Sequence, residues 1–235
     1  MTGPAGGPGL SCAIMGHPDR ADHVQALATE LAPLRPRISY EHTAFSDHSL
    51  LASATTAWRL VEAGASHQLV VQDDVLARPD LAELLAPIIA EQPEAGIALF
   101  CEWGCKTSYA ARIAALAGFA GVEVCDRYTP TNALVLPAPV AAALADRLAE
   151  RTTLGPAPDD TIVWELLAER GVRCLLVLPT LVEDRALPSL VGNEVMGTRR
   201  SVCQWPDGTG LAREGGGALL GPRPFFLVSV ETKRT

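Results

Sequence analysis

The stretch HQLVVQDDVLARPDL, residues 67–81, places two adjacent carboxylates directly after a hydrophobic segment. Residues 68–71 are mostly apolar and favour β-structure, which predicts a buried strand. Asp73 and Asp74 follow at its end. Like charges side by side repel, and neither can be buried without compensation. Three interpretations are open: a divalent-metal site, a general acid or base, or a polar strand exit exposed to water.

Strand-like and helix-like segments alternate on both sides of this stretch, which predicts an α/β fold with one mixed sheet flanked by helices. The expected strands are residues 10–15, 36–43, 67–71, 95–101, 121–128, 131–137 and 172–179. The expected helices are residues 21–34, 51–64, 79–92, 109–118, 138–151 and 159–171. Pro87 should shorten or bend its helix, Gly64 should cap another, residues 45–50 should form a polar turn, and residues 180–208 should be irregular.

Composition limits the possible functions. The chain has 235 residues, of which 48% are hydrophobic and 20% charged, so it is globular rather than disordered. A net charge of −8 argues against a general nucleic-acid binder. We expect no membrane span, and the first 16 residues lack the features of a secretory signal, so a cytoplasmic location is expected. Cys101 and Cys105 form a C-x3-C pair without further ligands nearby, which favours buried free thiols over zinc.

Length and glycine content suggest how the chain is divided. Residues 1–9 are expected to be a flexible leader and residues 10–205 a single catalytic domain. Residues 206–235 are a Gly-rich segment followed by a strand-like arm. That arm could return to the body or pair with a second chain, so a homodimer is possible.

Two more acidic sites favour a functional role for Asp73 and Asp74 over a simple polar strand exit. Asp159 and Asp160 stand where a helix is expected to begin, and Glu183 and Asp184 follow the last predicted strand. In α/β sheets, ligands bind beyond the carboxyl ends of the strands. Three acidic sites at loop or strand ends are the distribution expected of one metal-and-base site. Helix capping by Asp159, with Asp160 in the first turn, is the alternative for that pair.

Several motifs resemble a known family when they are taken in order. These are AIMGHPDR, TTAWRLVEAGASHQLVVQDDVLARPDL, TNALVLP, PDDTIVWELLAERGVRCLLVLPTLVED and LPSLVGN. Together they look like GT-A-type glycosyltransferases and are most similar to glycosyltransferase family 25 (lipooligosaccharide-type) and its compact bacterial relatives. The resemblance covers about residues 10–205. It implies a GT-A-like, Rossmann-type sheet and transfer of a sugar from a nucleotide-diphosphate donor, such as a UDP- or GDP-sugar, to a hydroxyl of a small molecule or glycan.

The resemblance also implies roles for individual residues. The nucleotide would lie against the first-strand loop and the turn after the second strand, at Gly16, His17, Pro18, Arg20, Ser46 and Asp47. Mn2+ or Mg2+ would be held by Asp74, with Asp73 beside it, and by Asp184 or Glu183. Asp160 or Asp159 would be the catalytic base of an inverting member. Further phosphate contacts could come from Arg20, Lys106, Arg199 and Arg200, although each could equally be a solvated surface cation.

Departures from the family pattern keep two other functions open. Gln72 stands where relatives usually carry Glu, and Asp184 stands where they often carry His. A degenerate protein that binds nucleotide sugars without transferring them is therefore conceivable. The other alternative is a nucleotidyltransferase of similar topology, although GHPDR is poor in the glycines that its phosphate loop would need. Trp103, in the loop EWGCKTS, is a candidate sugar platform, whereas Trp58 is expected in the core.

Overall fold

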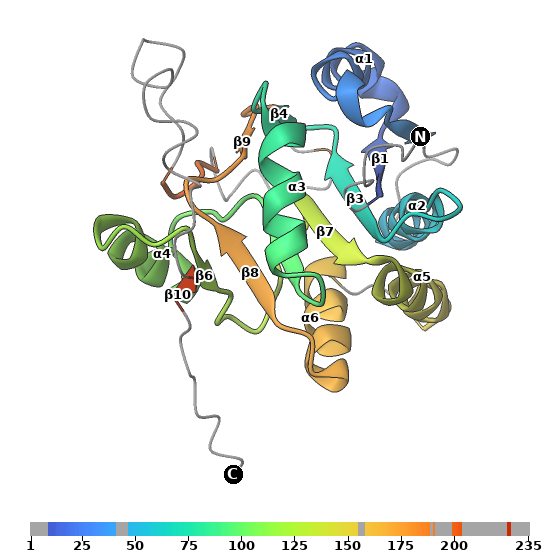
Figure 1. Cartoon of the computed structure of the whole chain (residues 1–235). Helices are drawn as coiled ribbons and strands as arrows, with labels where there is room; N and C mark the ends of the chain where they lie inside the picture. Colours follow the sequence, from blue (N-terminus) through green and yellow to red (C-terminus); the bar gives the residue numbers. More distant parts are fainter. Residues whose placement is uncertain are drawn as a thin grey trace, which may run out of the picture.

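The structure is a computed structural model, and it describes residues 9–40, 47–154, 158–188, 190, 199–203 and 225–226, with backbone only for 47–49 and 225–226. Its main element is an eight-stranded sheet in the order β10-β6-β8-β5-β7-β3-β1-β2 (Figure 1). The strands are β1 (Leu10–Gly16), β2 (Arg37–Tyr40), β3 (His67–Gln72), β5 (Gly96–Ala98), β6 (Gly121–Glu123), β7 (Ala133–Pro137), β8 (Cys174–Val177) and β10 (Phe225–Phe226). A separate two-stranded ladder joins β4 (Val75–Ala77) to β9 (Val182–Asp184).

The direction of the strands brings the predicted sites to one edge of the sheet. β1 pairs in parallel with β2 and β3, and β5 pairs in parallel with β8. β7 runs antiparallel to both β3 and β5, so β1, β3, β5 and β8 all point the same way. The carboxyl ends of these four strands, together with the start of β7, therefore form one edge of the sheet. The β4–β9 ladder continues from the end of β3 on this side (Figure 1).

Helices cover both faces of the sheet. One face packs against α1 (Ala21–Glu30) and α3 (Leu81–Glu91), and its core contains Val24, Leu27, Leu85 and Ile88. The other face packs against α2 (Asp47–Arg59), α4 (Lys106–Leu116), α5 (Ala138–Thr152) and α6 (Asp159–Arg170). The predicted α/β class, a mixed sheet flanked by helices, is confirmed.

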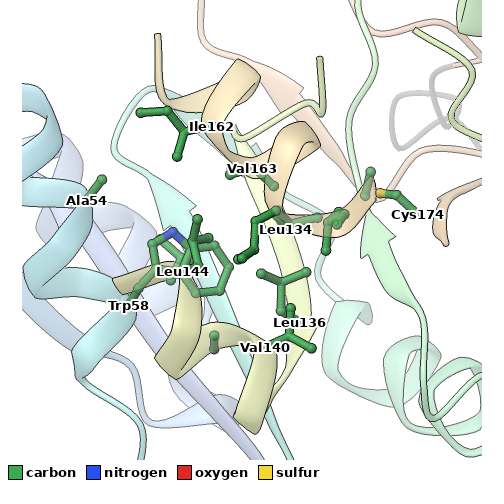
Figure 2. Packing of buried hydrophobic residues seen from close by; sticks show 14 of the residues in the cluster. Ala54, Trp58, Leu134, Leu136, Val140, Leu144, Ile162, Val163 and Cys174 are labelled. Atoms are coloured by element: carbon green, nitrogen blue, oxygen red, sulfur yellow. The ribbon is translucent and has the colours of Figure 1, made fainter. Parts of the chain in front are cut away.

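Trp58 lies in the core, as predicted. Only 3% of it is exposed, and Figure 2 shows its indole among Ala54, Leu144 and the side chains of β7 and α6. A large aromatic side chain that is fully packed in this way is not accessible to a nucleobase. The helix α2 is therefore attached to the sheet through Trp58, and this fixes the helix that leads into β3.

Four local predictions differ from the structure in whole or in part. Pro87 does not shorten its helix, because α3 continues through it to Glu91, with buried side chains on both sides of the proline; whether Pro87 bends the helix stays a prediction. The helix α2 ends at Arg59, well before Gly64, and it begins at Asp47, inside the segment expected to be a turn. The strand β9 forms where irregular chain was expected, because its backbone pairs with the short β4.

No helix in the described ranges is long and apolar enough to cross a membrane.

Candidate functional site

Asp73 holds the first-strand loop in place. The loop leaves β1 at Gly16, and its first backbone N–H, that of His17, donates to Asp73 Oδ2 at 2.7 Å. Arg20, in a short 3-10 helix (Pro18–Arg20), donates from Nη1 to Asp73 Oδ1 at 2.8 Å and from Nη2 to the carbonyl of Pro188 at 2.6 Å. Both carboxylate oxygens of Asp73 are thus used within the protein. Its geometry is that of a residue that positions Arg20 and the loop.

Asp74 lies beside Arg20, the residue that Asp73 holds in place. Its Oδ2 lies 3.5 Å from Arg20 Nη1 and 3.7 Å from Arg199 Nη2. Its other oxygen, Oδ1, is buried and has no hydrogen-bond partner among the described residues. Burial raises the pKa of this carboxyl above its ordinary value; the charges of Arg20 and Arg199 lower it, whereas those of Asp73 and Asp184 raise it. A buried carboxylate oxygen without a hydrogen-bond partner is unfavourable, so Oδ1 indicates a place for a cation or a donor from a ligand.

Asp184 comes to the same place from the end of β9. Val75 pairs with Asp184 across the β4–β9 ladder, and Asp184 Oδ2 lies 3.4 Å from Arg199 Nε. The neighbouring Arg185 fixes the ladder, because it donates to the carbonyl of Val75 and pairs with Glu30 of α1. Arg199 therefore bridges Asp74 and Asp184, two residues that the sequence assigned to a metal.

Glu183 points away from these groups. It is 1% exposed, and its Oε1 accepts from the backbone N–H groups of Asp184 and Ser201 at 2.9 Å each. Neighbours on a strand face opposite sides, which explains why only one residue of this pair reaches Arg199. Asp184 is thus the member of the pair beside Arg199, whereas the second oxygen of Glu183, Oε2, is buried without a hydrogen-bond partner among the described residues.

Glu102 belongs to the same cluster, although the sequence did not single it out. It follows β5 in the loop before α4, and its backbone pairs with Ser201. Burial raises the pKa of Glu102, the charge of Arg199 lowers it, and Asp160 and Asp184 raise it. A single Glu in a polar loop carries no local signal of function. Its position at the end of a strand parallel to β3 was the one clue available.

Asp159 and Asp160 complete the site from the first turn of α6. The N-cap residue of α6 is Pro158, so the alternative prediction that Asp159 caps this helix was wrong. Instead Asp159 Oδ1 accepts from the N–H of Asp160 at 2.9 Å. Burial, with a smaller effect from the Asp160 charge, raises the pKa of Asp159 to about 6, while a hydrogen bond from Thr131 opposes the rise. Such a carboxylate is ionised at neutral pH and can still accept a proton effectively.

Gln72 connects the two acidic pairs. Its Nε2 donates to Thr131 Oγ1 at 3.3 Å, and Thr131 is the residue whose hydroxyl acts on Asp159. The backbone N–H of Gln72 also donates to the carbonyl of Asn132 at 2.8 Å. Gln72 is thus built into the site, with an amide where the resemblance predicts a carboxylate.

The remaining predicted residues fall into three groups. Gly16, His17 and Pro18 lie in the loop beside Asp73, and a side chain at Gly16 would meet Val24 Cγ2 at 2.8 Å, so close packing requires glycine there. Lys106 is exposed at the start of α4, where its N–H donates to Asp126. Asp47 begins α2 with its side chain undescribed, and Ser46 lies outside the described residues.

Some of the side chains at this site are of the type that binds Mn2+ or Mg2+. Across the ranges that the structure describes, no group of three or more His, Cys, Asp or Glu side chains is arranged to hold a metal ion. The open oxygen of Asp74 and the carboxylate of Asp184 are nevertheless the type of ligand these ions prefer, and Mg2+ is often held by one or two carboxylates plus phosphates and water. The residues therefore fit an ion whose shell is completed by a substrate.

The chain has only distant similarity to the known proteins that were compared with it. No known family model matches the chain, and no curated protein matches it. Similar solved structures include a 4-diphosphocytidyl-2C-methyl-D-erythritol synthase from Anaerococcus prevotii, with a TM-score of 0.39 and 10% identity over 81% of this chain and 96% of that one. Another is a mannose-1-phosphate geranyltransferase from Thermus thermophilus, with a TM-score of 0.33 and 12% identity over 72% and 73%. At this level of similarity we take neither structure as a guide to fold family or activity, and the resemblance to glycosyltransferase family 25 stays a prediction.

Proposed function

We propose that this protein is a glycosyltransferase of GT-A type that uses Mn2+ or Mg2+ and a nucleotide-diphosphate sugar. The observation that carries the proposal is the arrangement around Asp74: a buried carboxylate with one unpartnered oxygen, at the end of a central strand, between Arg20 and Arg199. This combination suits a diphosphate and the cation that accompanies it, because guanidinium groups bind phosphate oxygens and carboxylates bind the cation.

The Arg20 side chain is already held in a fixed position, which suits it for binding a phosphate. Its guanidinium is 11% exposed and is oriented by Asp73 and the Pro188 carbonyl, so it need not be ordered again when a ligand binds. Arg199 is 31% exposed and is shared between Asp74 and Asp184. In the proposal, Arg20 binds the diphosphate, and Arg199 exchanges a carboxylate partner for a phosphate oxygen.

Asp74 and Asp184 would hold the metal ion. When bound, such an ion neutralises the charge that develops on a leaving diphosphate. Asp73 does not bind it, because both of its oxygens are engaged with His17 and Arg20. Its contribution is to keep the loop and Arg20 in position.

Asp159 is the base in this proposal. Its pKa of about 6 leaves it ionised at neutral pH and within a useful range for taking a proton from an acceptor hydroxyl. Asp160 raises that pKa through its charge. The stereochemical outcome, the sugar and the acceptor are left open, since they depend on a substrate position that these residues do not define.

Titration calorimetry with UDP and with GDP, each with and without Mn2+, tests the binding half of the proposal. We expect one of the two nucleotides to bind, more tightly with Mn2+, and the binding to weaken in Asp74→Asn. Matched Asp146→Asn, at a 77% exposed side chain away from the site, should bind like the wild type. Failure of both nucleotides to bind in the presence of Mn2+ would overturn the proposal.

Turnover tests the second half. Incubation with UDP- and GDP-sugars should release the nucleotide slowly in water and faster with a suitable acceptor hydroxyl. Metal-dependent binding with no hydrolysis and no transfer would instead support a nucleotide-sugar-binding protein.

A nucleotidyltransferase is the second candidate, and one observation favours it. Two arginines face the acidic edge, whereas in the described part of the chain no three acidic or imidazole side chains gather as a metal cage. A site dominated by guanidinium groups also suits a triphosphate. Incubation with a nucleoside triphosphate and a sugar 1-phosphate distinguishes the two, because only a nucleotidyltransferase releases pyrophosphate.

A further inference from the structure

Two thiols face each other beside the candidate site. Cys101 follows β5 and is fully buried, and Cys105 occupies the N-cap position of α4 and is partly exposed. Their sulfur atoms are 3.4 Å apart. A disulfide requires about 2.05 Å, so the two sulfurs need to approach by only about 1.4 Å.

The surroundings assign different roles to the two sulfurs. Cys105 Sγ accepts from the N–H of Ser108 at 3.3 Å at the N-terminus of the eleven-residue α4, and it faces the Cys101 thiol. These contacts lower the pKa of Cys105 to about 7, with the Cys101 hydrogen bond as the largest cause; burial and the charge of Asp126 oppose them. The buried Tyr128 hydroxyl also lowers it, although it meets no partner at normal hydrogen-bond geometry among the described residues. The pKa of Cys101 is raised instead, by its hydrogen bond to Cys105 and by burial.

The loop between the cysteines can accommodate ring closure. It consists of Glu102, Trp103 and Gly104, and Gly104 adopts φ +98°, with open space where a Cβ would stand. The carbonyl of Glu102 lies 3.6 Å from each sulfur, so both thiols already turn toward the same point. Shortening the distance between sulfurs therefore requires a small adjustment of one short turn.

We propose that Cys101 and Cys105 form a redox-active pair that closes a reversible intramolecular disulfide by exchange with a small-molecule disulfide. The partly exposed Cys105 thiolate attacks one sulfur of the small disulfide, forms a mixed disulfide and expels one thiolate. Cys101 then loses its proton to solvent and attacks Cys105 Sγ, which expels the second thiolate. One protein disulfide forms, the small disulfide is reduced to two thiols, and a reducing thiol reverses both steps.

The pair adjoins the candidate site through Glu102. The Glu102 side chain interacts electrostatically with Arg199, Asp160 and Asp184, and its backbone pairs with Ser201. Disulfide formation moves the turn that contains Glu102. The redox state of the pair therefore changes the acidic edge, whatever reaction that edge catalyses.

Oxidised glutathione and the full-length reduced protein provide the test. After exchange at pH 7.5, free thiols are blocked with N-ethylmaleimide and the protein is digested with trypsin. Cys101 and Cys105 share a tryptic peptide, residues 60–106, since Pro79 prevents cleavage after Arg78. This peptide contains no other cysteine. We expect this peptide to lose two hydrogens and to escape blocking, and dithiothreitol to restore both thiols.

Single substitutions assign the order of attack. Cys101→Ser should accumulate a glutathione adduct on Cys105, because the resolving thiol is gone, whereas Cys105→Ser should leave Cys101 unmodified. Cys125→Ser is the matched control and should form the 101–105 disulfide as fast as the wild type. The proposal is overturned if the wild type keeps a glutathione adduct on Cys105, bridges Cys105 to another cysteine, or stays reduced while an exchange-competent control dithiol is oxidised under the same conditions. Because the readout uses the wild-type protein directly, a variant that fails to fold would not remove the test.

Discussion

The chain contains two Asp-Asp pairs, and the structure compensates them in different ways. Asp73 and Asp74, at the end of β3, face the guanidinium groups of Arg20 and Arg199. Asp159 and Asp160, at the start of α6, have backbone N–H groups, a threonine and the helix N-terminus. Full positive charges favour ionised carboxylates and bound phosphate, whereas the weaker compensation leaves Asp159 with a raised pKa. In the proposed function, the first dipeptide is therefore the charge-binding pair and the second the proton-transfer pair.

The largest expected effect comes from neutralising Asp74, the member of the charge-binding pair that has an unpartnered oxygen. Asp74→Asn keeps the shape but removes the ligand charge, so the proposed transfer should fall by about a thousandfold, or about 4 kcal/mol at 1.36 kcal/mol per tenfold. The melting temperature should change little, because relief of the buried charge and of its repulsion with Asp73 offsets the lost ion pairs with Arg20 and Arg199. Initial rates of nucleotide release measure the effect, with Asp146→Asn as the control. A variant with near-normal turnover would show that Asp74 is not part of the site.

The other member of this pair should affect stability more than binding chemistry. Asp73→Ala removes the acceptor of the His17 N–H and the nearest carboxylate of Arg20, whose side chain is 11% exposed and which keeps the more distant Asp74 and the Pro188 carbonyl. Breaking a buried pair from one side costs about 3 kcal/mol. For a domain of this size that lowers the melting temperature by roughly 6 to 12 °C in scanning calorimetry.

Asp19→Ala provides the control in the same loop, because the Asp19 side chain is 79% exposed and its ion-pair contact in the described part of the chain is with His17. It should stay within about 0.5 kcal/mol of the wild type. If both variants melted alike, Asp73 would not be the residue that holds the loop.

The sequence predicted the centre of the site better than its surroundings. Asp74 and Asp184 could be found because each follows an apolar strand-like segment, and strand ends in an α/β sheet converge. Arg199 was named as one of several candidate cations, but nothing in its neighbours marks it as the residue between these two carboxylates. Glu102 was missed because its role depends on β5 lying between β7 and β8, which is a property of the sheet order.

The same limit applies to the fold. Long periodic segments such as α5 and α6 were predicted within one or two residues, since their apolar spacing is repeated over several turns. The strands β4 and β9 have three residues each, which is too short for a periodic signal. They exist because they pair with each other across a large separation in sequence and because Arg185 joins them to Glu30.

A smaller effect is expected where the two pairs are connected, at Gln72. Its amide donates to Thr131, which leaves the Thr131 hydroxyl proton for Asp159. In Gln72→Glu, the new carboxylate would accept that proton and add a negative charge, and both changes raise the pKa of Asp159. We expect a rise of about one unit, the equivalent of 1.36 kcal/mol.

The measurement is the pH dependence of kcat/KM for nucleotide release between pH 5 and 8.5. Because a base acts when deprotonated, the acidic limb should move to higher pH by that amount. Gln25→Glu adds the same charge on exposed α1 and should leave the profile in place. An unchanged profile in Gln72→Glu would mean that the two pairs do not communicate through Thr131.

The smallest effect separates the two members of the proton-transfer pair by how far each changes stability as the pH changes. The folded pKa of Asp159, about 6, lies above its ordinary value of 3.8. Between these values the folded protein binds more protons than the unfolded chain, so the contribution of Asp159 to stability is full below pH 4 and is lost as pH rises toward 6. Two pKa units correspond to about 3 kcal/mol, but Asp159 is only partly buried, so solvent screening should leave about a third of that. Asp159→Asn avoids this loss and should melt roughly 2 to 4 °C above the wild type at pH 7.5, with little difference at pH 4. Asp160→Asn removes the repulsion with Asp159 as well as a charge that favours the helix N-terminus. These two effects oppose each other, so its melting temperature at pH 7.5 should change less than that of Asp159→Asn. If Asp159→Asn melted no higher than the wild type at pH 7.5, or gained as much at pH 4 as at pH 7.5, the raised pKa could not be assigned to Asp159, and this residue would lose its claim to be the base.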